Sequence, residues 1–241
     1  MEWKIGCSGY HYPGWKGIFY PESLAQRKWF EFYSRHFSTL ELNVFYYRFP
    51  RLEVVQRWRD RSPAGFCFSV KAPQQITHLR KMADARNMVG EFSQLAREGL
   101  GEKLGCVLFQ FPSSFEYNIE NFARLIEMTD LNVRNVFEFR HASWWNPYVY
   151  EALKRADIGF CAMSHPQLPN QVVNTTDSLY YRLHGVPHLY SSAYDVPTLE
   201  RLAQEIIATG SKQSFIYFNN TAEGHAIRNA RQMQEICELV H

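Results

Sequence analysis

The chain has 241 residues, of which 46% are apolar and 16% are aromatic. This length and composition allow a sizeable buried core, which excludes the disordered and fibrous classes. The 26 Lys and Arg residues nearly balance the 24 Asp and Glu residues. The surface as a whole therefore lacks the positive excess of a dedicated nucleic-acid binder.

Eight short runs of β-branched and aromatic residues recur along the chain and predict strands. They cover residues 4–8, 39–45, 66–71, 104–111, 135–140, 158–164, 179–184 and 214–219. Most are followed by apolar residues at helical spacing, which predicts helices over 24–37, 52–60, 83–97, 119–128, 148–155, 198–208 and 226–240. Asn118 and the pair Asn146-Pro147 are typical of helix starts.

This alternation of strands and helices predicts the fold class. Runs such as residues 105–111 are apolar on both faces, as in a parallel sheet covered by helices. Eight units of about 30 residues fit a (β/α)8 TIM-like barrel, predicted as a single domain over residues 1–241. Residues 164–177 contain prolines and no helical period, so we expect the helix between strands six and seven to be short or missing. A doubly wound sheet is the alternative, but no glycine-rich fingerprint follows the first strand.

The sequence also bears on localisation. The first residues contain no apolar h-region, and the longest uncharged stretch, 158–176, includes His165 and prolines. We therefore expect no signal peptide, no transmembrane helix and a cytoplasmic location. The cysteines are odd in number, far apart and mostly in apolar runs, which predicts reduced core thiols. They are Cys7, Cys67, Cys106, Cys161 and Cys237.

Polar side chains stand near the carboxyl ends of six predicted strands. In a barrel the chemistry lies at these ends, and residues two apart on a strand share a face. The residues are Glu41 and Asn43, Ser69 and Lys71, Gln110, Glu138 and Arg140 with His141, Arg182 and His184, and Asn219 with Asn220. Unpaired charge in a barrel interior is costly, so these residues are expected either to pair with one another or to bind a ligand.

The sum of charges at these ends predicts the sign of the ligand. Three cations, Lys71, Arg140 and Arg182, face two carboxylates, Glu41 and Glu138. Histidines at the ends and in the loops, including His184, His141, His11 and His78, add positive charge when protonated. Arginine forks suit phosphate or carboxylate groups. We therefore expect a small anionic ligand.

Two further features fit such a ligand. Residues 219–225 lead from strand eight into a helix through Gly224, and free amides at such a start can bind an anion. An ordinary capped helix start is the alternative. Aromatic residues in several loops, Tyr10 and Trp144 among them, could stack on a flat group, although loop aromatics more often pack in the core.

A metal site is the sharpest alternative. Glu41, Glu138, His141 and His184 could supply nitrogen and oxygen ligands. However, no His-x-x-x-His spacing occurs, and three cations share the same strand ends. We expect no tightly held metal and no cofactor, with a divalent metal left open.

The same segments carry a resemblance to a known family. They are Ile5-Gly-Cys-Ser-Gly-Tyr10, Phe37-x-x-x-Glu41-x-Asn43, Phe68-x-Val-Lys71-Ala-Pro, Leu108-Phe-Gln110-Phe-Pro, Phe137-Glu138-Phe-Arg140-His141, Tyr181-Arg182-Leu-His184-Gly and Tyr217-Phe-Asn219-Asn220. In these motifs the chain resembles the YecE-like family (domain of unknown function 72) over nearly its whole length. The resemblance implies a TIM-like barrel and little about activity. The segment between strands six and seven looks short for this family.

The leading functional prediction is an enzyme acting on a small phosphorylated or carboxylated metabolite, as a hydrolase, lyase or isomerase. Glu41 or Glu138 would act as the general base, Lys71 would stabilise negative charge, and His184 would be the acid. The expected ligand contacts are Tyr10, Asn43, Gln110, Arg140, His141, Trp144, Arg182, Asn219, Asn220 and Gly224.

Three alternatives stay open from the sequence. The first is metal-dependent phosphodiester chemistry on nucleic acid, by analogy with endonuclease IV-type barrels, although the near-neutral charge and the few carboxylates make it less favoured. The second is a non-catalytic module that binds an anionic metabolite. The third is a glycosidase that uses the two glutamates.

Overall fold

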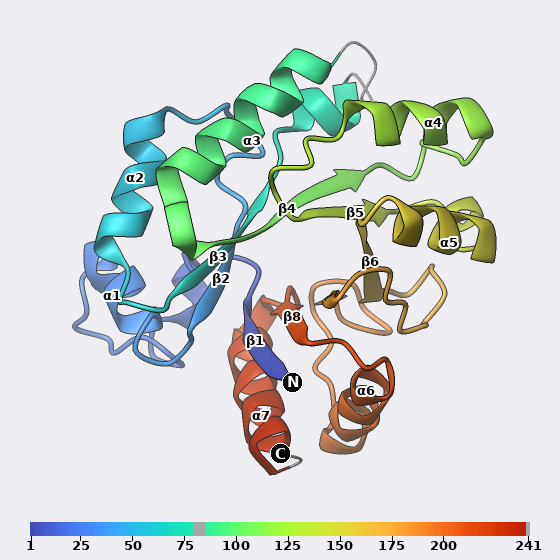
Figure 1. Ribbon diagram of the computed structural model, residues 1–241. Helices are drawn as coiled ribbons and strands as arrows, with labels where there is room; N and C mark the ends of the chain where they lie inside the picture. Colours follow the sequence, from blue (N-terminus) through green and yellow to red (C-terminus); the bar gives the residue numbers. More distant parts are fainter. Residues whose placement is uncertain (80–84, 240–241) are drawn as a thin grey trace. The chain divides into compact units, whose positions relative to one another are not determined.

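A computed structural model describes residues 1–79 and 85–239 of the chain (Figure 1). Its eight strands are β1 (Glu2–Cys7), β2 (Thr39–Leu42), β3 (Cys67–Lys71), β4 (Leu104–Phe111), β5 (Asn135–Phe139), β6 (Gly159–Ser164), β7 (Ser178–Leu183) and β8 (Gln213–Phe218). They follow the order β1-β8-β7-β6-β5-β4-β3-β2. This parallel order, alternating with helices, is the predicted (β/α)8 TIM-like fold and confirms that prediction.

Some of the helices begin at a capping side chain, and others begin without one. They are α1 (Trp29–Tyr33), α2 (Leu52–Arg61), α3 (Arg86–Leu100), α4 (Ile119–Met128), α5 (Pro147–Arg155), α6 (Val196–Ala208) and α7 (His225–Leu239). The Asn118 side chain accepts the Asn121 N–H at 2.7 Å, and Asn146 accepts the Val149 N–H at 3.1 Å. These contacts confirm both predicted N-caps. Residues 165–177, all described, contain no helix, as predicted.

The chain divides into two compact units. Unit 1 comprises Met1–Glu41 and Ala162–His241, and unit 2 comprises Leu42–Cys161. In unit 1, β8 pairs with both β1 and β7, and α7 packs on β1, β8 and α6. Gly6 allows β1 to approach β2 closely, because a Cβ there would lie 2.4 Å from the Thr39 carbonyl oxygen. The predicted single domain stays a prediction.

In unit 2 the register of the strands sets the position of the polar side chains. β4 pairs with β3 and with β5, and Gln110 on β4 stands opposite Glu138 on β5. α2 packs against α3, and α3 also contacts β4 (Figure 1). The carboxyl ends of β3, β4 and β5 therefore meet at one edge of unit 2.

Two predicted elements differ from the structure. The first predicted helix, 24–37, is a 3-10 turn (Gln26–Lys28) followed by the short α1. Strand two ends at Leu42 rather than at residue 45, because the chain turns there and the Tyr46 N–H donates to the Asn43 carbonyl at 3.1 Å. Phe45 is buried by this turn and not by a strand. Residues 83–84 and 240, at the ends of two predicted helices, lie outside the described residues.

The remaining global predictions concern cysteines and membranes. All five cysteines lie in the described part of the chain and are free; four are buried, and Cys67 is partly buried. The expected reduced thiols are thus present, mostly in the core. Among the residues that the structure describes, no helix is both long and apolar enough to cross a membrane.

Candidate functional site

The carboxyl ends of β3, β4 and β5 in unit 2 bring together Lys71, Gln110, Glu138 and Arg140, which we call the strand-end cluster. The Lys71 ammonium donates to Gln110 Oε1 at 2.6 Å and lies 4.0 Å from the centre of the Tyr46 ring. Arg140 Nε donates to Glu138 Oε1. The strand ends thus place two cations, one carboxylate and one amide near one another, as the alternation of residues predicted.

Exposure differs within the Glu138–Arg140 pair. The Glu138 side chain is 0% exposed, whereas that of Arg140 is 12% exposed. The Cys161 thiol on β6 lies 3.7 Å from the other carboxylate oxygen, Oε2. Burial of a carboxylate is tolerated because it is paired and hydrogen-bonded, and here the cation is the partner that reaches solvent.

His78 adds a titratable ring to this part of unit 2. It stands on a π-helical turn, Gln75–Leu79, and its Nδ1 lies 2.9 Å from the Thr77 hydroxyl. Partial burial lowers the pKa of His78, and the positive charges of Lys71 and Arg140 lower it further against the opposing effect of Glu138. The neutral imidazole, which can accept a proton, is therefore favoured near neutral pH.

Unit 1 contains a second polar group of residues, the buried network of Ser8, Glu41, Tyr180 and Arg182. Arg182 Nη2 donates to Glu41 Oε1 at 2.7 Å and to Ser8 Oγ at 3.0 Å. The Ser8 hydroxyl also donates to Glu41 Oε1, and the Tyr180 hydroxyl donates to Oε2 at 2.7 Å. Glu41 and Arg182 are 0% and 2% exposed. Both carboxylate oxygens are thus satisfied within the unit.

The network also influences Tyr12, which lies beside it. The Tyr12 hydroxyl donates to the Ser8 carbonyl at 2.6 Å. Burial raises the pKa of Tyr12 to about 12, and the nearby Cys7 and Glu41 raise it in the same direction. Tyr12 therefore stays protonated at neutral pH and acts as a hydrogen-bond donor.

His184 and Asn219 meet at the ends of β7 and β8, also in unit 1. The Asn219 side-chain amide lies 3.0 Å from His184 Nδ1, which places the proton of a neutral ring on Nε2 if the amide donates. His184 is fully buried, and its ring lies edge-on to His165 and Tyr190. The predicted roles of His184 as a catalytic residue and of Asn219 as a ligand contact stay predictions.

Three predicted ligand contacts are buried and packed against other parts of unit 1 or unit 2. Trp144 is 0% exposed, stacks on Phe139 at 4.1 Å and donates to the Phe115 carbonyl. Asn220 is buried and donates to the Ser192 carbonyl and to Asn229 Oδ1. Gly224 has a φ of 71°, and a Cβ there would lie 2.7 Å from Ile18. Trp144 thus packs in the core and Gly224 packs against a loop residue, while the predicted ligand contacts of all three residues stay predictions.

Three other predicted contacts, Tyr10, Asn43 and His141, are partly exposed. The Tyr10 ring lies 5.6 Å from that of Phe30, and Asn43 stands in the turn after β2. His141 caps a 3-10 turn, because its Nδ1 accepts the Ser143 N–H at 3.2 Å. These local contacts explain where each of the three side chains lies. Their roles in ligand binding stay predictions.

The sequence predictions missed three members of these groups. Tyr180 stands two residues before Arg182 on β7, and Ser8 follows β1 two residues after Gly6. The same alternation that selected Arg182 could have selected Tyr180. Cys161 lies inside an apolar run, so no sequence signal distinguishes its contact with Glu138 from ordinary burial.

Metal ligation was the main alternative for these residues. The described residues contain no group of three or more His, Cys, Asp or Glu side chains arranged to hold a metal ion. Glu41 and Glu138 each have an arginine as the partner of the carboxylate.

The motifs that form these groups lie within the part of the chain that matches a known protein family. The profile of the family described as "Protein of unknown function DUF72" matches residues 4–241. The chain belongs to the DUF72 family. This confirms the YecE-like resemblance, whose motifs supply all four members of the strand-end cluster.

Relatives of the chain carry family names only. It is 29% identical to the UPF0759 protein YunF of Bacillus subtilis, over 98% of this chain and 94% of that protein. It is 36% identical to the UPF0759 protein YecE of Escherichia coli K12, over 35% of this chain and 31% of that protein. Among solved structures, a DUF72 protein from Thermotoga maritima matches with a TM-score of 0.89 and 29% identity, covering 99% of this chain and all of the other. A DUF72 protein from Enterococcus faecalis matches with a TM-score of 0.83 and 20% identity, over 99% and 96%.

Proposed function

We propose that the protein is an enzyme that binds a small carboxylated or phosphorylated metabolite at the strand-end cluster and moves a proton on it. The observation that carries this proposal is the convergence of Lys71, Gln110, Glu138 and Arg140 on three neighbouring strand ends. In TIM-like barrels, residues at these ends perform the chemistry.

The charges of the cluster favour an anion. Lys71 and Arg140 outnumber Glu138, and Arg140 is the more exposed member of its ion pair. A guanidinium matches the two oxygens of a carboxylate or phosphate, and an ammonium supplies a compact second charge. The Gln110 amide, already bonded to Lys71, fixes the position of the ammonium.

The acid–base roles follow from the same contacts. Glu138 is the proposed general base: its carboxylate accepts a proton from the ligand, and the electron pair of the broken bond stays on the ligand. Lys71 stabilises the negative charge that develops there. His78, held neutral near pH 7 by its lowered pKa, is a further proton acceptor within electrostatic reach of both. All three proposed roles are performed by side chains of the protein.

The predicted catalytic roles of Glu41 and His184 are not needed by this proposal. Glu138 is as buried as Glu41, but its partner Arg140 reaches solvent, whereas the partner of Glu41, Arg182, is 2% exposed. Glu41 is also held by Ser8 and Tyr180, and the buried His184 lies within hydrogen-bond distance of Asn219. We infer that Glu41 and Arg182 stabilise unit 1.

The test is a thermal-shift screen against phosphorylated and carboxylated metabolites, with and without divalent ions, followed by a turnover assay on each hit. Variants Lys71→Met and Arg140→Lys are screened beside wild type. Lys154→Met, which removes an exposed lysine on α5, is the matched control. We expect both cluster variants to weaken binding of the same hit at least about tenfold, with the control unchanged.

Three outcomes would contradict the proposal. The first is a hit that both cluster variants bind as tightly as wild type. The second is binding without turnover of any hit, which would assign the cluster to a non-catalytic binding module. The third is full turnover by a Glu138→Gln variant, which would remove the general base.

A further inference from the structure

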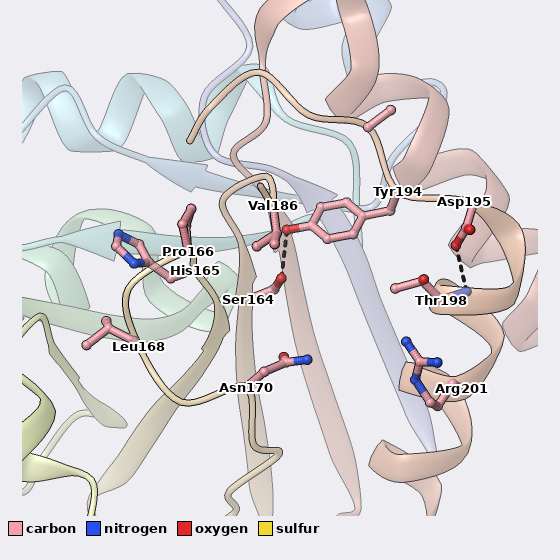
Figure 2. Close-up of a pocket in the computed structure, with 11 residues that line it drawn as sticks. Ser164, His165, Pro166, Leu168, Asn170, Val186, Tyr194, Asp195, Thr198 and Arg201 are labelled. Atoms are coloured by element: carbon pink, nitrogen blue, oxygen red, sulfur yellow. Dashed lines mark hydrogen bonds between the residues drawn. The ribbon is translucent and has the colours of Figure 1, made fainter. Parts of the chain in front are cut away.

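A cavity in unit 1 lies apart from the contacts of the buried network. Its volume is about 540 Å³, within the range of small-molecule sites, and it lies between the β6–β7 connection, the loop after β7 and the start of α6 (Figure 2). The residues of the β6–β7 connection that line it replace the helix that a full (β/α)8 repeat would place there.

The Tyr194 hydroxyl beside the cavity accepts one hydrogen bond and donates another. The Gly185 N–H donates to the Tyr194 hydroxyl at 2.8 Å. The Tyr194 hydroxyl in turn donates to Ser164 Oγ at 2.9 Å, a bond drawn in Figure 2. The Ser164 hydroxyl proton is therefore left as a donor. Ser164 is only 8% exposed and lines the cavity. A buried donor of this kind costs free energy unless a ligand or water accepts its proton.

Two more donors approach the cavity from different elements. Asn170, on the β6–β7 connection, accepts the Tyr181 hydroxyl at 3.2 Å through Oδ1, so its amide N–H groups remain as donors. Arg201, on α6, makes no hydrogen bond and no ion pair within 4.0 Å in the described part of the chain, although its charge acts on Asp195 and lowers the pKa of that carboxyl. Figure 2 shows the two side chains extending toward the cavity from the connection and from the helix.

The acceptors that line the cavity are already used. Asp195 caps α6: its carboxylate accepts the Thr198 N–H at 3.0 Å, and hydrogen bonding to Thr198 lowers the pKa of Asp195. This cap occupies the helix N-terminus itself. His165 Nδ1 accepts the Gln167 N–H at 3.2 Å. The cavity therefore offers donors and the Arg201 cation, together with the Asp195 carboxylate that caps α6 and apolar walls made by Pro166, Leu168, Val186 and Ala193.

We propose that this cavity is a second binding site, for a small hydroxy-carboxylate. The carboxylate would bind the Arg201 fork, and hydroxyl oxygens would accept from Asn170 and Ser164 while the carbon skeleton packs on the apolar wall. The site is independent of the proposed function, because it uses no member of the strand-end cluster.

The experiment is isothermal titration calorimetry of the full chain with two acids and their neutral counterparts. Gluconate is paired with glucitol, and glycerate with glycerol, so that each pair differs only in the group at one end. We expect at least one acid to bind with a dissociation constant of about 1 mM or tighter, and neither polyol to bind.

Variants locate the site. Arg201→Ala should weaken binding of the acid at least about tenfold, and Asn170→Ala about threefold. Gln204→Ala, an exposed residue on the same helix, is the matched control and should bind as wild type. Because Arg201 and Asn170 are both exposed, their variants should keep the wild-type melting temperature without ligand.

Four results would overturn the proposal. They are no binding of either acid at about 10 mM, equal binding of acid and polyol, full binding by Arg201→Ala and Asn170→Ala, and loss of binding in Lys71→Met with Arg201→Ala unaffected. The last result would assign the acid to the strand-end cluster, so failure of this proposal is distinguishable from failure of the proposed function.

Discussion

The buried network of unit 1 and the strand-end cluster of unit 2 arise from the same sequence pattern with different outcomes. Each places a glutamate and an arginine from strand ends in an ion pair. In unit 1 the arginine is 2% exposed and the carboxylate has two further hydroxyl donors, Ser8 and Tyr180. In unit 2 the arginine is 12% exposed and a lysine lies close by on β3. Alternation along a strand thus predicts where charges stand, whereas the exposure of the arginine differs between the two pairs; on this difference we propose a stabilising role for the first pair and a ligand-binding role for the second.

The largest expected effect is on stability in unit 1. Glu41→Gln removes the carboxylate that holds a nearly fully buried Arg182, so we expect a loss of about 3–5 kcal/mol of unfolding free energy. Urea unfolding measures the change. A double variant, Glu41→Gln with Arg182→Met, should recover part of the loss because the buried charge is gone. A loss below about 1 kcal/mol would contradict the stabilising role.

The matched change in unit 2 should cost less. Glu138→Gln leaves Arg140 partly exposed to water, so we expect a loss of about 1–3 kcal/mol. The same urea experiment compares the two glutamine variants directly. If Glu138→Gln is the more destabilising of the two, the difference drawn between the units is wrong.

The next effect is at alkaline pH and belongs to unit 1. The pKa of Tyr12 is raised to about 12 in the folded state, against about 10 when unfolded. The folded state therefore keeps a proton that the unfolded state loses, and stability should fall as the pH rises from about 10 toward 12. Tyr12→Phe should make this fall shallower. Tyr47→Phe, at a tyrosine that is 75% exposed, is the control and should leave the slope unchanged.

The smallest effect is at acid pH and belongs to unit 2. The pKa of His78 is lowered in the folded state, so the unfolded state binds the proton first as the pH falls. The contribution of His78 to stability is full above its unfolded pKa of about 6.5 and is lost below it. His78→Gln should reduce the dependence of unfolding free energy on pH between about 5 and 7, while the exposed-site variant His188→Gln keeps it. Equal slopes in wild type and His78→Gln would refute this assignment.

Much of the fold could be predicted because strands and caps have local signals. Strand 104–111 and helix 119–128 have the predicted bounds, and Asn118 caps the latter. The failures lie where tertiary packing overrides periodicity. The apolar residues of 24–37 fit a long helix, but only Trp29–Tyr33 is α-helical, with Trp29, Phe30 and Tyr33 buried. The apolar residues after Leu42 are buried by a turn.

The candidate site could be predicted in position but not in pairing. Glu138 and Arg140 could be selected together from the sequence because they lie two residues apart on the same short segment. The Glu41–Arg182 pair joins residues far apart in the chain, and no local signal selects that partner. Trp144 illustrates the other limit: an aromatic residue in a loop after a strand looks the same in sequence whether it faces a ligand or, as here, stacks on Phe139.

The most direct test of the central claim is a crystal structure of the wild-type protein bound to the tightest-binding metabolite of the screen. We expect the anionic group of the metabolite to contact both the Lys71 ammonium and the Arg140 guanidinium. A metabolite seated without contact to either residue would contradict it.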